Sequence, residues 1–137
     1  MKNWLFASLV ALLPLLTLGC GPSEYAVAGT SRAAGTDGKV TVEKIEGSFI
    51  VRVELEHLPP PSRLGSGINH YVLWLQPNNQ TPHREAILEY DEDDRAGRAT
   101  ATTPQGRFTM IITGERTAAP ASPSDVVVIR KAINPDS

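Results

Sequence analysis

The chain has 137 residues, of which 41% are hydrophobic, and its 13 basic and 15 acidic residues give a formal net charge of −2. This length predicts one domain, and the apolar content excludes a disordered chain. The balanced charge argues against a protein that binds nucleic acid through a basic face. With one cysteine, an intramolecular disulfide and a four-cysteine zinc site are both excluded.

Residues 1–19 have the organisation of a secretory signal peptide. Lys2 gives a basic start, and the segment from Trp4 to Leu18 is almost wholly apolar. A membrane-spanning helix needs roughly 20 apolar residues, and Pro14 disfavours a helix through the middle of this segment. The pattern therefore favours a signal peptide over an uncleaved membrane anchor.

The end of this segment, Leu16-Thr17-Leu18-Gly19-Cys20, resembles the bacterial lipobox, although Thr17 stands where an aliphatic residue is usual. The resemblance implies that the Cys20 thiol receives a diacylglyceryl group and that signal peptidase II cuts before Cys20. Two or three acyl chains would then hold the protein firmly to a membrane. A secreted protein with an unmodified cysteine is the alternative.

Residues 20–25 are expected to form a lipidated tether, and residues 26–137 a β-sandwich domain. Between Phe49 and Leu55, apolar residues alternate with mostly charged ones, which is the period-two pattern of a half-buried strand. Further strand-like runs are separated by turn residues, for example at Thr36-Asp37-Gly38. The expected strands span residues 26–32, 40–43, 49–55, 71–76, 85–90, 98–102, 107–113 and 126–131.

This spacing predicts an all-β fold, an immunoglobulin-like antiparallel sandwich of seven or eight strands. Large apolar side chains on the expected strands should form its core. The residues expected to be buried include Val51, Val53, Leu55, Trp74, Ile111 and Val128. We expect the Trp74 indole to lie between the two sheets, with a hydrogen-bond partner for its N–H group.

A second resemblance covers about residues 40–129. Leu58-Pro59-Pro60-Pro61, then Tyr71-Val72-Leu73-Trp74-Leu75, and later Thr113-Gly114-Glu115, are similar to the extracytoplasmic domain of anti-sigma-K factors. Arg116 stands where that family favours proline, and the family's helical sigma-binding part and transmembrane helix have no counterpart here. The resemblance therefore implies the sandwich fold and not the regulation of a sigma factor.

The acidic run Asp91-Glu92-Asp93-Asp94 is the main candidate for a metal site, because neighbouring carboxylates can bind Ca²⁺. It lacks an EF-hand-like spacing and has Arg95 beside it, which favours a solvent-exposed hairpin turn. His57, His70 and His83 show no short metal-binding spacing, so any metal site would have to be assembled by the fold. We therefore expect no metal site and no cofactor.

Motifs for catalysis are absent from the sequence. Ser66 lies in Gly65-Ser66-Gly67, which is not a nucleophile elbow, and neither a P-loop nor a dinucleotide-binding fingerprint occurs. We therefore expect no enzymatic activity. The sequence indicates an envelope lipoprotein that is anchored through Cys20 to the periplasmic or cell-surface side of a bacterial membrane. Its domain is expected to be a binding or structural module, and its partner would be another protein of the envelope.

Two other classes stay open. One is a ligand- or calcium-sensing lipoprotein whose site lies in the acidic run or in the loop over residues 58–69. The other is a hydrolase, which would need a serine, a histidine and an acidic residue brought together by the fold.

Overall fold

The computed structural model describes residues 21–135, which form nine strands and two short 3-10 helices, η1 (Ser31–Ala33) and η2 (Pro61–Arg63). The strands are β1 (Ser23–Ala28), β2 (Asp37–Ile45), β3 (Ser48–Glu56), β4 (His70–Pro77), β5 (His83–Ile87), β6 (Glu89–Asp91), β7 (Ala96–Thr103), β8 (Phe108–Glu115) and β9 (Val127–Ile133). All strand pairs are antiparallel.

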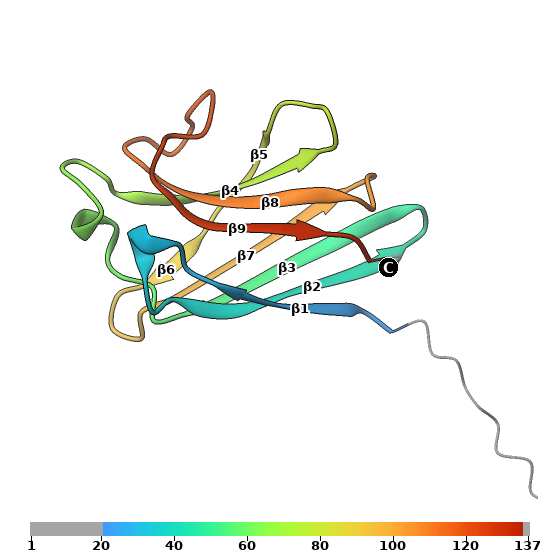
Figure 1. Ribbon diagram of the computed structural model, residues 1–137, viewed down its shortest axis with the longest axis horizontal. Helices are drawn as coiled ribbons and strands as arrows, with labels where there is room; N and C mark the ends of the chain where they lie inside the picture. The colour runs from blue at the N-terminus through green and yellow to red at the C-terminus, as the bar shows by residue number, and fades with distance from the viewer. Residues whose placement is uncertain (1–20, 136–137) are drawn as a thin grey trace, which may run out of the picture.

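The strands form two sheets that pack face to face (Figure 1). One sheet has the order β1-β2-β3-β7-β6, and the other has the order β5-β4-β8-β9. Apart from β1, these orders match strands A-B-E-D and C′-C-F-G of an immunoglobulin domain. The predicted all-β, immunoglobulin-like sandwich is therefore confirmed, with β1 as an additional strand at the edge of the first sheet.

The strand boundaries differ from those expected, for example at the end of the first strand, which stops at Ala28 instead of residue 32. Two of the differences affect how the chain enters and joins the sheets. Strand β1 begins at Ser23, which pairs with Val42, so part of the segment expected to be a tether belongs to the sheet. The run expected as one strand over residues 85–90 is divided at Leu88, because β5 pairs in one sheet and β6 in the other. Leu88 is buried and donates its backbone N–H to the carbonyl of Tyr71, so the chain changes sheets at a fixed point.

The main core lies between the two sheets and contains alternate residues of the central strands. On β3 these are Val51, Val53 and Leu55, and on β8 they are Met110 and Ile112, all at most 1% exposed. The six residues expected to be buried are all buried, with exposed fractions of at most 2%. Alternation in β-strands sends neighbouring residues to opposite faces, so the polar residues between those of β3 point to solvent.

The expected position of Trp74 between the sheets is wrong. Trp74 is 1% exposed, but it packs with Val72 and Ile111 in a separate cluster, whereas Leu73 faces the main core. The cluster therefore lies on the outer face of the second sheet. The segment between β8 and β9, residues 116–126, folds back over this part of the molecule (Figure 1), where the side chain of Arg84 on β5 donates a hydrogen bond to the carbonyl of Pro120.

A hydrogen-bonded network connects Trp74 to this covering segment. The Trp74 Nε1–H group donates to Thr113 Oγ1 over 2.9 Å, and the Thr113 hydroxyl donates to Glu115 Oε2 over 2.6 Å. The same carboxylate oxygen accepts the backbone N–H of Ser124 over 2.9 Å. Thr113 is fully buried and Glu115 is 5% exposed. Because buried polar groups need partners, this network holds the covering segment over the indole.

We predict that Thr113→Val lowers the free energy of unfolding by about 2–4 kcal/mol, because it leaves a buried indole N–H without its acceptor and removes a donor from a buried carboxylate. Urea unfolding followed by circular dichroism measures this change. Thr109→Val, at a half-buried position on the same face of β8, is the control and should change stability by less than about 0.5 kcal/mol. Equal effects of the two substitutions would contradict the role of the network.

Candidate functional site

The two ends of the sandwich are different in character. The start of β1 and the end of β9 lie at one end, together with the β2–β3 and β7–β8 turns (Figure 1). The long connections lie at the other end, which we call the distal end. It comprises residues 29–36, 57–69, 92–95 and 116–126. Binding residues commonly lie on loops that a rigid scaffold positions, so the candidate site is sought there.

Two tyrosines fix the longest of these connections, residues 57–69, to the sandwich. The hydroxyl of Tyr71 donates to the carbonyl of Pro59, and that of Tyr90 donates to the carbonyl of Leu58 over 2.7 Å. The two rings pack edge to face, with centroids 5.6 Å apart. Burial raises the pKa of both phenols, so both stay protonated donors at neutral pH. The loop is therefore held at its start by the hydroxyl groups of a buried and a half-buried tyrosine.

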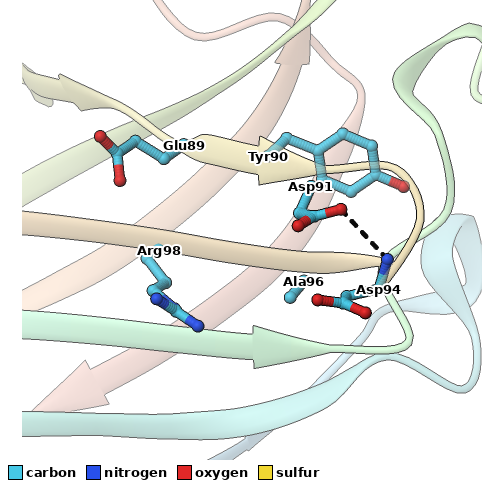
Figure 2. A pocket seen from close by; sticks show the side chains of 6 residues that line it. All are labelled: Glu89, Tyr90, Asp91, Asp94, Ala96 and Arg98. Carbon is cyan, nitrogen blue, oxygen red and sulfur yellow. Dashed lines mark hydrogen bonds between the residues drawn. The ribbon is translucent and has the colours of Figure 1, made fainter.

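The acidic run forms the exposed turn between β6 and β7, as expected from the sequence (Figure 2). Asp91 Oδ1 accepts the backbone N–H groups of Asp93, over 3.0 Å, and of Asp94, over 3.2 Å. This is an Asx turn, in which a side chain supplies the acceptor that the turn needs. The turn borders an open hollow of about 190 Å³ whose lining includes Tyr90 and Arg98. One oxygen of the Asp91 carboxylate is thus used by the backbone of the turn.

The three histidines are not brought together. His57 follows β3 and His70 begins β4, both at the distal end, whereas His83 begins β5 at the opposite end. Ser66 lies in the distal connection, where its carbonyl accepts a hydrogen bond from the Arg116 side chain over 3.1 Å. Among the residues described, no hydrogen bond joins the Ser66 side chain to a histidine, so no pair of nucleophile and base is seen there.

The fold does assemble one cluster of metal-ligating side chains, formed by Asp37, Glu56 and His57. One possible ligand atom from each lies within 4.8 Å of the others. Asp37 begins β2 and is paired directly with Glu56, the last residue of β3. His57 Nδ1 lies 2.6 Å from Asp37 Oδ1, and the side chains of His57 and Asp37 are 71% and 59% exposed. The hydrogen bond to Asp37 and the charges of Asp37 and Glu56 raise the pKa of His57.

Short spacings between histidines give no sign of this cluster, because two of its three members are acidic. Asp37 and His57 are 20 residues apart, and Asp37 lies in the turn-like sequence Thr36-Asp37-Gly38. The hairpin register does indicate that the two acidic residues meet. When the alternating residues of the two expected strands are aligned across the turn at Gly47, Asp37 lies opposite Glu56.

Cys20, the residue expected to carry the lipid, lies outside the residues that the structure describes, as does the expected signal segment. Within residues 21–135, no helix is long and apolar enough to cross a membrane. Comparison of the chain with protein-family models, with curated proteins and with solved structures finds no match.

We predict that Asp91→Ala lowers the free energy of unfolding by about 0.5–1.5 kcal/mol, because the substitution removes the acceptor of two backbone N–H groups in the turn. Asp91→Asn keeps a side-chain oxygen that can accept these bonds and should be nearly neutral, as should Asp93→Ala. Urea unfolding measures all three. If Asp93→Ala were as destabilising as Asp91→Ala, the Asx turn would not be the stabilising feature.

We also predict that Asp37→Asn lowers the pKa of His57 toward the ordinary histidine value of 6.5. The ion pair between His57 and Asp37 stabilises the folded state fully at pH values below the pKa that His57 has in the unfolded chain. This stabilisation is lost as the pH rises through the higher pKa of His57 in the folded state. Nuclear magnetic resonance titration of the His57 imidazole, with a chelator present, measures the shift. Glu46→Gln, at the far end of the same hairpin, changes the net charge equally and should leave the His57 titration unaltered.

Proposed function

We propose that this protein is a lipid-anchored lipoprotein of a bacterial cell envelope whose β-sandwich acts as a binding or structural module. The observation that carries the proposal is the apolar segment that ends in Gly19-Cys20. A lone thiol is a liability in an oxidising compartment unless something occupies it, and diacylglyceryl transfer would occupy it. The immunoglobulin-like fold supports the second half of the proposal, because such domains commonly serve at cell surfaces.

The position of β1 supports a close attachment to the membrane. Ser23, the first residue of β1, is only three residues after Cys20. Three extended residues span at most about 10 Å. A lipidated Cys20 would therefore hold the end of the sandwich where β1 begins close to the bilayer surface, nearer than the six-residue tether expected from the sequence.

The same geometry directs the distal end away from the membrane. Strand β1 runs from the attached end toward the distal end (Figure 1). A nine-residue strand such as β3 is about 30 Å long at 3.3 Å per residue. The loops over residues 57–69, 92–95 and 116–126 would then face the surrounding compartment at about that height.

The net charge of the mature chain also favours attachment through the lipid. Loss of Lys2 with the signal segment changes the formal net charge from −2 to −3. Surface charge would therefore not attract the domain to anionic lipids, and the lipid would hold it to the membrane.

We predict that Cys20→Ala abolishes both cleavage and lipid attachment, because the modified thiol is what signal peptidase II recognises in a lipobox. Intact-mass measurement of the membrane-extracted protein would show a diacylated species beginning at Cys20 for the unaltered chain, and an uncleaved precursor for the variant. Ser23→Ala, beyond the cleavage site, is the control and should be processed normally. A mature protein with an unmodified thiol would overturn the proposal.

The alternative of a ligand-sensing lipoprotein has one observation in its favour, the cluster of Asp37, Glu56 and His57 at the distal end. A ligand site at this cluster would not depend on lipid attachment.

A further inference from the structure

We propose that Asp37, Glu56 and His57 form a binding site for a divalent transition-metal ion of the zinc class at the distal end of the sandwich. This goes beyond the proposed function and departs from the expectation, drawn from sequence spacing, that the histidines take no part in a metal site. It rests on the donor set, on the cross-strand charge pattern and on the way the backbone holds these residues.

The donor set suits zinc better than calcium. One imidazole nitrogen and two carboxylates are ligands that Zn²⁺ accepts, and three protein ligands leave a coordination position for water or for another molecule. Calcium prefers six to eight oxygen ligands, which this cluster does not offer. Ligands of a tetrahedral zinc ion lie about 3.4 Å apart. The three ligand atoms lie within 4.8 Å of one another, and all three residues are exposed.

The charge pattern across the β2–β3 hairpin supplies an independent argument. Asp37 and Glu56 are direct cross-strand partners, and like charges in such positions are destabilising. Two residues along the same strands, Lys39 and Glu54 are also partners, and they form an ion pair with a separation of 3.5 Å. The hairpin thus neutralises one pair of facing residues with opposite charges. The other pair consists of two carboxylates, of which Asp37 is paired with the His57 imidazole.

A bound cation would neutralise the two carboxylates directly. The Asp37 carboxylate also makes a hydrogen bond with His57 Nδ1. Asp37 and Glu56 also line an open hollow of about 350 Å³, together with Gly38, Lys39 and Glu54. The hollow gives a hydrated ion and a further ligand access from solvent.

The backbone around His57 is fixed on both sides, so the imidazole is presented at a defined place. His57 has a positive φ of 56°, a conformation that is uncommon for residues other than glycine. Its carbonyl accepts a hydrogen bond from the buried Thr36 hydroxyl over 3.0 Å. The next residue, Leu58, is fully buried and donates its N–H to the carbonyl of Arg95. Ligands on fixed elements lose less freedom when they bind a metal.

The test is isothermal titration calorimetry with zinc chloride on the full chain in detergent, carrying Cys20→Ser so that the thiol cannot bind the ion. We expect one equivalent of zinc per chain. His57→Asn removes the imidazole, and asparagine tolerates the positive φ at this position. This substitution should weaken zinc binding at least about tenfold, because loss of a residue that only supports a metal ligand already weakens metal binding by about that factor. Asp37→Asn and Glu56→Gln should each weaken binding as well.

Two matched variants serve as controls. His83→Asn removes a histidine at the opposite end of the sandwich, and Asp91→Asn removes a charge from the acidic turn; both should keep the original affinity. Circular dichroism establishes that each variant is folded, and zinc should shift the imidazole resonances of His57 in the unaltered site. Absence of saturable binding, binding that survives His57→Asn, loss of binding in either control, or calcium binding tighter than zinc binding would each overturn the proposal.

Discussion

Strand β4 is buried on both faces, and the arrangement of the other elements depends on this double burial. Leu73 and Leu75 face the main core, while Val72 and Trp74 face away from it and are equally buried. A sheet in a sandwich normally buries one face and exposes the other to solvent. Here the outer face of β4 needs a cover, and the segment between β8 and β9 provides it. The indole N–H, a polar group that burial would otherwise leave without a partner, is linked to that cover through Thr113 and Glu115.

The same principle shapes the distal end, where the buried Tyr71 and the half-buried Tyr90 donate to the backbone of the connection over residues 57–69. Tyr71 and Tyr90 hold the carbonyls of Pro59 and Leu58. A fully buried Leu58 then fixes the chain directly after His57. Each hydrogen bond contributes only about 1 kcal/mol, but each satisfies a group inside or beside the core. The exposed Asp37, Glu56 and His57 are therefore displayed on a backbone that the interior holds in place.

The residues on which the expected resemblance to the anti-sigma-K extracytoplasmic domain was based have structural roles in this fold. The quoted residues Leu58, Tyr71, Trp74, Thr113 and Glu115 all belong to the two hydrogen-bonded arrangements just described. None of the five needs a ligand to account for its position. Residues with such structural roles support an expectation about the fold and none about activity. The proposed function therefore depends on the expected lipobox, and the proposed metal site depends on a different set of side chains.

The sequence by itself determined the fold class, most strand positions and the burial of the six expected core residues, because period-two alternation and turn residues are local properties of the chain. It also placed the acidic run correctly in an exposed turn. The face on which Trp74 lies, the change of sheet at Leu88 and the meeting of Asp37 with Glu56 and His57 were decided only by the tertiary structure. A strand that is apolar on both faces carries no local sign of which face meets the other sheet, and the register of a hairpin follows from pairing along its whole length.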